Sequence, residues 1–427
     1  MKPGLWPERL ALLAGLLLNA LAAVFYVTPL VTMNTASRLA TIDSLVHRGT
    51  YRIEDSRYFF TIDKSCFDGR FYSSKPPLLS TVLAGPYWVW NRLTGLSFDK
   101  AEPAAVKFIS IVGAGIPHLI LLLYFYRCLL LWTEDRAGRV LGMLALSFGY
   151  LGLAYIGGVN NHTPGAAALC AAFYYTLRIR LGQARGDGDW LLAGATTALV
   201  PLLELPGALF SLAFGLALLR QDWRRTLTRF VPAALPVLAL HPLLTSLSIG
   251  GWLPAYLRGS GHFYPGSYWY APTGIDNLNE SHGVYLFHVL LGHHGLFSMM
   301  PVLLLAPLGA WWRGRLLPRG WRDGALVWVP FVLVVVLLVF ETNNYGGCCV
   351  GFRWLLFVAP LLFLFSVSAL ARLRGWAWRT VFVLGILVAA LHVADALPRP
   401  YGPWNHSRWH TWFIAHGWGS VPPEAGR

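Results

Sequence analysis

The chain has 427 residues, of which 56% are apolar and only 13% are charged, and its mean hydropathy is +0.51. This composition is typical of membrane proteins and excludes an ordinary soluble enzyme. The formal net charge of +14 would also suit a nucleic-acid-binding protein, but much of the Lys and Arg excess falls in short loops between apolar segments, as in the cytoplasmic loops of membrane proteins. We therefore expect membrane lipid as a partner and no nucleic acid.

An apolar run opens the chain. The segment from Leu10 to Thr32 is long enough to span a bilayer. It is too long for the apolar region of a cleaved signal peptide, and it lacks a clear small-residue cleavage site. We expect a retained first helix at about 8–32, with a cytoplasmic N-terminus because Lys2 and Arg9 lie near its start.

The polar stretch from Asn34 to Pro77 predicts a long external loop, which we place at 33–102. Its density of charged side chains does not fit a lipid environment. Apolar residues recur at helical spacing from Leu39 to Val46 and predict an amphipathic helix at the membrane surface. The apolar segment after Lys75-Pro76-Pro77 is short and contains Pro86, so we expect an interfacial helix and not a span.

Further apolar segments predict the remaining spans. They lie at about 103–126, 140–158, 164–179, 190–203, 206–219, 230–249, 296–312, 325–340, 354–371 and 380–395. Every loop that this scheme assigns to the cytoplasm has an excess of Lys and Arg, which supports it. The expected fold is an all-α polytopic membrane protein with about 11 transmembrane helices over residues 1–395. The second long external loop is 250–295, and the tail 396–427 is also external.

The unusual polar clusters then all face outward. They are the 34–77 stretch, Asn160 to His162, Glu204, the 250–295 loop and the segment from Glu341 to Arg353. Their arrangement predicts a site at the outer membrane surface. The five cysteines form no CxxC pair, and GxxxxGK[ST], GxGxxG and HExxH motifs are absent, so neither a structural zinc site nor nucleotide-driven chemistry is supported.

The first external loop resembles that of the GT-C glycosyltransferases, in particular the lipid A aminoarabinose transferases and protein O-mannosyltransferases. The residues that carry the resemblance are Arg38, Ala40, Gly49, Gly69, Tyr72, Lys75, Pro76, Pro77 and Leu78. Segments 292–301 and 345–355 are also similar to segments of bacterial members. The resemblance implies transfer of a sugar from a polyprenyl phosphate or diphosphate to an acceptor at the outer face, by direct displacement with inversion. It implies no cofactor beyond the lipid-linked donor, and no sequence pattern supports a divalent metal.

One departure concerns the general base. The resembled enzymes carry an acidic pair just after the first helix, whereas this chain has Asn34-Thr35-Ala36-Ser37 there. Either another carboxylate is the base or the chain only binds its ligand. Asp63 is our first candidate, because Lys64 is its neighbour and about a dozen residues separate it from Lys75, which is short enough for a fold-back. Asp43 and Asp55 are the alternatives.

The candidate substrate-binding residues are mostly cations and polar groups of the outward loops. Lys75 and Arg353 would hold the donor phosphate, although a snorkelling lysine and an interface anchor are the alternatives. Asn161 and His162 would contact substrate, or cap the helix before Pro164. The other candidates are Arg38, Lys64, Tyr72, His293 and His294. Adjacent histidines point in different directions, so this pair is a weak metal site.

The sequence therefore predicts a polyprenyl-phosphate-sugar-dependent glycosyltransferase in the inner membrane, with a glycan, lipid or protein as acceptor. The alternative is a non-catalytic protein that binds or transports a lipid-linked glycan. Convergence of Asp63, Lys75, His162 and Arg353 in one outward pocket would favour the enzyme, and a polar track through the helix bundle would favour transport.

Overall fold

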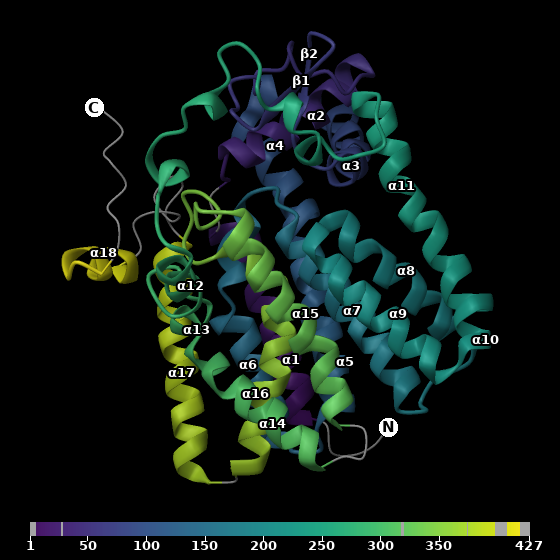
Figure 1. The fold of residues 1–427 in the computed structure, drawn as a ribbon, viewed down its shortest axis with the longest axis vertical. Coiled ribbons are helices and arrows are strands. Elements are labelled where there is room, and N and C mark those ends of the chain that lie inside the picture. Colours follow the sequence, from purple (N-terminus) through teal and green to yellow (C-terminus); the bar gives the residue numbers. More distant parts are fainter. Residues whose placement is uncertain (1–5, 27–28, 317–319, 374, 398–407, 419–427) are drawn as a thin grey trace.

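Long apolar helices run side by side through most of the molecule (Figure 1). The computed structural model describes residues 6–26, 29–316, 320–373, 375–397 and 408–418. Most of the predicted tail 396–427 lies outside these ranges. The helices are α1 (Trp6–Leu21), α2 (Met33–Arg48), α3 (Pro77–Thr94), α4 (Phe98–Ser110), α5 (Ile116–Trp132), α6 (Arg136–Gly149), α7 (His162–Arg180), α8 (Asp187–Leu203), α9 (Ala208–Gln221), α10 (Trp223–Arg225), α11 (Val231–Ile249), α12 (His282–Leu290), α13 (Leu296–Met299), α14 (Ala306–Leu316), α15 (Gly320–Glu341), α16 (Ala359–Leu373), α17 (Trp376–Ala396) and α18 (Arg408–Ala415).

The described helices confirm a polytopic helical membrane protein. Five helical segments are long and apolar enough to cross a bilayer, namely Trp6–Phe25, Phe98–Trp132, Trp223–Ile249, Gly324–Glu341 and Trp376–Ala396. A sixth is present if Arg136–Gly149 and Leu151–Gly157, bent by 42°, form one span. Every apolar segment that the sequence predicted as a span is mainly helical, and several of these helices are shorter or less apolar than the five.

Helix α7 lies inside the bundle. Between its two polar ends its residues are mostly small or apolar, and they are buried around most of its circumference, against α5 and α8. A helix that is buried on all sides shows no amphipathic stripe. Its N-terminus points toward the end of the molecule that carries the polar layer (Figure 1), which places the first turn of α7 directly beneath that layer.

The polar layer is built from the first long loop. Helix α2 begins after Thr32, whose side chain accepts a hydrogen bond from the backbone N–H of Thr35 at 3.2 Å, and it ends at Gly49 with φ 65°. Leu39 and Ile42 are fully buried, but every other residue from Thr35 to Ser44 is buried as well, polar ones included. This part of α2 is therefore enclosed on both faces and lacks the exposed polar face that a helix at the membrane surface would have. Helix α3 starts at the second proline of the Pro-Pro pair, and it is not among the helices that qualify as spans.

A short β-hairpin, which the sequence did not predict, stands at the top of this layer (Figure 1). Strands β1 (Lys64–Phe67) and β2 (Arg70–Ser73) pair antiparallel, with Lys64 opposite Ser73. The turn consists of Asp68 and Gly69, with φ values of 50° and 71°. Positive φ at both positions is the geometry of a two-residue turn whose twist matches that of the strands.

The second long loop packs onto the hairpin. The ring of Tyr264 meets that of Phe71 at 5.0 Å between centroids, and Nε1 of Trp269 donates to the carbonyl of Ile62 at 3.2 Å. The guanidinium of Arg258 lies 4.3 Å from the ring centroid of Phe67. The loop therefore covers the hairpin through aromatic contacts between segments about 200 residues apart in the chain.

Candidate functional site

An ion pair joins the two ends of the β-hairpin. Nζ of Lys75 lies 2.9 Å from Oδ1 of Asp63, and 21% and 15% of the two side chains are exposed. The hairpin register explains the contact, because Lys64 pairs with Ser73 and the backbone N–H of Ser74 donates to the Asp63 carbonyl at 3.1 Å. The predicted fold-back between Asp63 and Lys75 is therefore present.

The segment after the first helix uses neutral groups where the resembled transferases carry an acidic pair. Oγ of Ser37 donates to the carbonyl of Asp63 at 2.5 Å and lies 2.6 Å from Oγ of Ser73. Asn34 accepts from Arg38 through both its backbone and its side-chain oxygen. The segment thus holds a carboxylate and a cation in place without contributing a carboxylate of its own.

Arg38 is the most deeply buried cation of this region. It is 2% exposed, and its guanidinium donates to Asn34 and, through Nη2, to Oδ1 of Asn161. Its Nε is buried and has no hydrogen-bond partner among the described residues. A buried guanidinium with an unused donor is suited to bind an oxyanion.

A glycine-rich segment between α15 and α16 brings in Arg353. Tyr345, Gly346, Gly347 and Gly351 all have positive φ, at 53°, 85°, 86° and 72°. Glycine adopts this left-handed geometry without a steric penalty. The Arg353 side chain passes over Gly346, where a Cβ would lie 3.1 Å from its Cγ. Nε of Arg353 is buried and makes no hydrogen bond to any residue in the described ranges.

The start of α7 completes the cluster. Asn160 caps the helix, because its Oδ1 accepts from a backbone N–H of the first turn at 3.0 Å. The side chain of Asn161 accepts from Arg38 and donates from Nδ2 to Oε1 of Glu204 at 2.8 Å. Nδ1 of His162 lies 2.6 Å from the same oxygen. Capping therefore accounts for Asn160, whereas Asn161 and His162 belong to the polar network.

The charges of these side chains act on one another. Burial alone would raise the pKa of Asp63, but Lys75, with Arg353 and Arg38, holds that pKa below its usual range. Burial lowers the pKa of Lys75, while Asp63 opposes the shift and Arg38 and Arg353 add to it. Burial also lowers the pKa of Arg38 to about 10, which leaves it charged at neutral pH. The four groups therefore occupy one electrostatic site.

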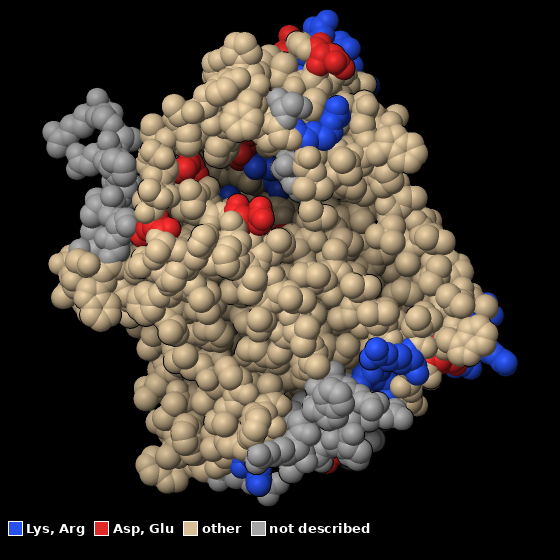
Figure 2. All heavy atoms as spheres, viewed as in Figure 1, with Lys and Arg blue, Asp and Glu red and all other residues tan. Residues whose placement is uncertain are grey.

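This site carries more cations than carboxylates. Among the groups that act on one another here, the three cations Arg38, Lys75 and Arg353 outnumber the two carboxylates Asp63 and Glu204 by one when the carboxylates at the rim and the histidines are left out. Figure 2 shows a hollow beneath the upper layer, with Lys and Arg atoms inside it and Asp and Glu atoms at its rim. The balance of charge favours an anionic ligand.

The other carboxylate candidates and Lys64 point elsewhere. Oδ2 of Asp43 is 2.7 Å from Nη2 of Arg48, so this pair is satisfied within α2. Asp55 is exposed on the turn before the hairpin. Nζ of Lys64 donates to the carbonyl of Phe59 at 2.8 Å and lies 3.8 Å from the centroid of its ring. The structure brings none of these three into the charged cluster.

The remaining candidates lie in supporting positions. Tyr72 sits in β2 and packs against an apolar cluster shared with the second long loop. His293 and His294 are buried at the turn between α12 and α13. The ring of His294 stacks on Tyr345 with centroids 4.8 Å apart, and its carbonyl accepts from the backbone N–H of Phe352 at 2.8 Å. These contacts link the histidines to the glycine-rich segment.

Two residues of the site received no role from the sequence. Glu204 stood out only as an outward carboxylate between two apolar segments. His262 lies in the second long loop, with Nδ1 3.5 Å from Oγ of Ser65. Burial lowers the pKa of His262, and Lys75 adds to the shift while Asp63 opposes it. No local motif marks His262, because its place depends on how the loop folds over the hairpin.

No group of three or more His, Cys, Asp or Glu side chains within the described ranges is arranged to hold a metal ion. All five cysteines are free thiols, including the adjacent Cys348 and Cys349.

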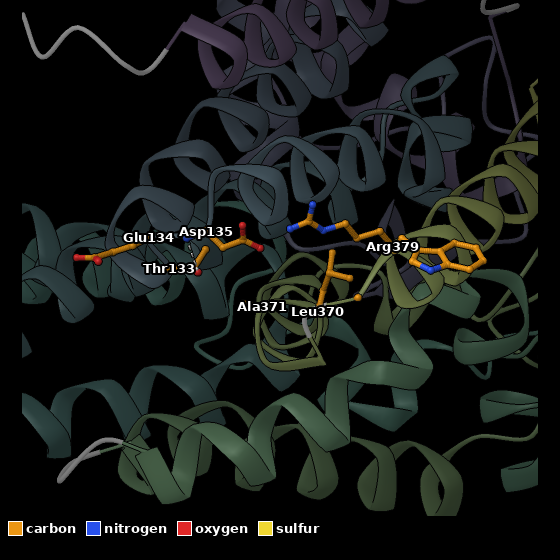
Figure 3. Close-up of a pocket in the computed structure, with 8 residues that line it drawn as sticks. Thr133, Glu134, Asp135, Leu370, Ala371 and Arg379 are labelled. Atoms are coloured by element: carbon orange, nitrogen blue, oxygen red, sulfur yellow. Dashed lines mark hydrogen bonds between the residues drawn. The ribbon is translucent and has the colours of Figure 1, made fainter.

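A separate cavity of about 610 Å³ lies at the other end of the bundle (Figure 3). In Figure 3, Asp135 and Arg379 face each other across it, whereas Glu134 points away. The lining residues come from the end of α5, the start of α6 and the connection from α16 to α17, and none of them belongs to the charged cluster.

The fold matches solved membrane transferases. ArnT from Cupriavidus metallidurans bound to undecaprenyl phosphate aligns with a TM-score of 0.56 and 16% identity over 91% of this chain and 64% of that one. Its apo structure aligns with a TM-score of 0.55 and 14% identity over 91% and 63%. The apo oligosaccharyltransferase from Archaeoglobus fulgidus aligns with a TM-score of 0.52 and 13% identity over 97% and 58%.

The chain thus spans less than two thirds of each of these longer proteins. No family model matches the sequence, and no curated protein matches it. Both neighbouring proteins are GT-C glycosyltransferases. The structural matches therefore establish the fold, which is that of a polytopic helical membrane protein of GT-C type.

Proposed function

We propose that the chain is a membrane glycosyltransferase that moves a sugar from a polyprenyl-phosphate-type donor to an acceptor at the outer face of the membrane. The observation that carries this proposal is the convergence of the Asp63–Lys75 ion pair with Arg38 and Arg353, within a GT-C fold. An ArnT with this fold binds undecaprenyl phosphate, which supports a lipid-linked donor here as well.

Arg38, Lys75 and Arg353 would grip the donor phosphate. A polyprenyl-phosphate sugar is a phosphodiester with one negative charge, which matches the single positive charge in excess at the site. The buried Nε atoms of Arg38 and Arg353 have hydrogen-bond capacity to offer. Charge-assisted hydrogen bonds to phosphate are about twice as strong as neutral ones. The prenyl chain would lie between helices beside the site.

Asp63 would act as the general base. The acceptor hydroxyl or amine attacks the anomeric carbon, the bond from that carbon to the phosphate oxygen breaks, and its electron pair leaves with polyprenyl phosphate. The acceptor proton passes to the Asp63 carboxylate, and the sugar inverts its configuration. Donor phosphate that binds Lys75 would also compete for the ammonium that now pairs with Asp63 at 2.9 Å, which would make the carboxylate a stronger base.

Binding or transport of a lipid-linked glycan is the other candidate function. The acidic pair that the resembled enzymes carry after the first helix is missing here, as the neutral Asn34 to Ser37 segment shows. The convergence of Asp63, Lys75, His162 and Arg353 at one end of the bundle favours the transferase. Transport would favour a polar path along the bundle axis.

We further propose that the protein lies in the inner membrane, with a cytoplasmic N-terminus, an external C-terminus, and no cofactor besides the donor. The acceptor would be a glycan, a lipid or a protein. Exposed Cys348 of the glycine-rich segment offers a test of orientation. In a Cys66→Ser background, a membrane-impermeant maleimide should label Cys348 from outside in intact cells, and Cys348→Ser should remove that signal. Labelling only after lysis would show the opposite orientation.

The test of function uses cells and purified protein together. Envelope glycans and lipid-linked sugars from cells with and without the protein should differ by one sugar, and undecaprenyl phosphate should bind the protein in lipid nanodiscs. Asp63→Asn should bind this lipid but leave the glycans as in cells that lack the protein. Lipid binding with unchanged glycans in wild-type cells would favour the binding or transport function. Absence of both would refute the proposal.

A further inference from the structure

Glu204 is a buried carboxylate to which the proposed reaction gives no role. It lies between α8 and α9 and is 5% exposed. Its stem packs against the first turn of α7, where Gly165 leaves room for it, because a Cβ there would lie 2.6 Å from Cγ of Glu204. A carboxylate kept in such a place needs partners that repay its loss of hydration.

The partners of Glu204 both come from the start of α7. One oxygen, Oε1, accepts from Nδ2 of Asn161 at 2.8 Å and faces Nδ1 of His162 at 2.6 Å. An ionised carboxylate only accepts hydrogen bonds, so it fixes the amide nitrogen of Asn161 and the Nδ1–H of His162 toward itself.

The orientation of the Asn161 amide determines which of its atoms faces Arg38. With Nδ2 on Glu204, the oxygen of Asn161 faces the other way and accepts from Nη2 of Arg38. A guanidinium only donates hydrogen bonds, so Arg38 needs the oxygen of the Asn161 amide, whereas the Glu204 carboxylate needs its nitrogen. The side chain of Asn161 therefore relays the orientation set by Glu204 to the guanidinium, whose other partner is Asn34.

We infer that Glu204 is a positioning residue for the phosphate grip: through Asn161 it holds Arg38 where a donor phosphate binds. The inference rests on the proposed function. Two physical effects of removing Glu204 have opposite signs, which makes the inference testable. Loss of a nearby negative charge should strengthen binding of an anion by Coulomb attraction, whereas loss of the relay should weaken it by releasing Arg38.

The experiment measures the affinity of undecaprenyl phosphate for the protein in lipid nanodiscs. Glu204→Ala should weaken binding by about tenfold, the order of one charge-assisted hydrogen bond. Asn161→Leu keeps the charge of Glu204 but breaks the relay, and it should weaken binding to a similar extent. Combined with Arg38→Ala, either substitution should add little, because residues that act through one contact are not additive.

Asp189→Ala is the matched control. Asp189 is a buried carboxylate at the opposite end of the same helix α8, where it pairs with Arg178 at 3.2 Å. Its loss should lower the melting temperature at least as much as Glu204→Ala, without changing lipid affinity. If Glu204→Ala does not fold, Glu204→Met, which has a similar length but no oxygen to accept from Asn161, carries the test in the same double-mutant cycle.

The outcomes separate the two proposals. Suppose that the wild type binds undecaprenyl phosphate and that Arg38→Ala weakens this binding. If replacement of Glu204 then leaves the affinity equal or raises it, the role of Glu204 is overturned and the proposed function stands. Full additivity of the Arg38 and Glu204 substitutions overturns it too. A wild-type protein that does not bind undecaprenyl phosphate overturns both.

Discussion

The two ends of the α7–α8 helix pair bury charges in different ways. At one end, Arg178 has a single carboxylate, Asp189, at 3.2 Å, and its remaining donors reach Tyr174 and the carbonyl of Gln183. The carboxylate is satisfied further by the backbone N–H of Arg185 at 2.6 Å. Within this pair, charge and hydrogen bonds balance, as in an ion pair that serves the fold.

At the other end the balance is broken. Three cations share two carboxylates, and Nε of both Arg38 and Arg353 is buried without a hydrogen-bond partner in the described chain. Buried polar groups in native proteins are normally satisfied, and the exceptions require an explanation. The comparison teaches that burial of charge by itself does not mark a site, whereas surplus charge with unused donors does.

The largest effect should come from replacing Asp63, the proposed general base. If this effect is absent, the contrast between the two ends of the α7–α8 pair loses its functional meaning. Asp63→Asn should lower the transfer rate by about 10²–10⁴-fold, the range of general-base catalysis, because the amide cannot take the acceptor proton. Transfer is followed with a labelled lipid-linked sugar. Asp43→Asn and Asp55→Asn are the matched controls, because both residues lie outside the charged cluster, and their rates should stay near wild type. If one of them stops transfer while Asp63→Asn does not, the base is misassigned.

Breaking the Arg178–Asp189 pair should lower the stability of the fold and leave the transfer rate unchanged. Asp189→Asn leaves Arg178 buried without its carboxylate, and breaking such a pair typically costs about 3–5 kcal/mol of folding free energy. Thermal unfolding in detergent measures the loss, and the transfer rate of the protein that remains folded should not change. If Asp189→Asn instead lowered the transfer rate while stability stayed the same, the Arg178–Asp189 pair would have a functional role and the two ends would not differ in this respect.

The surplus cations should respond in donor affinity. Lys75→Ala and Arg353→Ala should each weaken undecaprenyl phosphate binding by about tenfold or more, because each removes a charge-assisted contact. Lys64→Ala is the control, since the ammonium of Lys64 points to Phe59 and away from the cluster. Equal affinities in all three variants would exclude this phosphate grip.

The smallest effect concerns pH. Lys75 is the main charge that keeps the pKa of Asp63 below its usual range, so the carboxylate of the wild type stays ionised as the solution becomes acidic. Lys75→Met should raise that pKa, and the acid limb of the kcat/KM profile should then move to higher pH. Lys64→Met should not move it. An unchanged limb in Lys75→Met would mean that Asp63 does not govern the acid side of the profile.

Much of the fold follows from the sequence because long apolar runs determine helices in a membrane. The contact of Asp63 with Lys75 was also predictable, since few residues separate them. The hairpin between them was missed because its strands have only four residues each, although Asp68-Gly69 is a recognised turn signal. Glu204 and His262 were missed because their roles depend on which distant loops meet.

The register of the hairpin sets where this part of the molecule can vary. Asp63 and Ser74 flank the paired strands, and the turn at Asp68 and Gly69 lies at the far end. Residues added in pairs, one to each strand, would lengthen the hairpin while the ion pair at its base kept the same partners, whereas a single added residue would turn one strand over. Such paired insertions would therefore leave the contact of Asp63 with Lys75 unchanged, whereas the packing of Phe67 against the second long loop limits how far the tip itself can change.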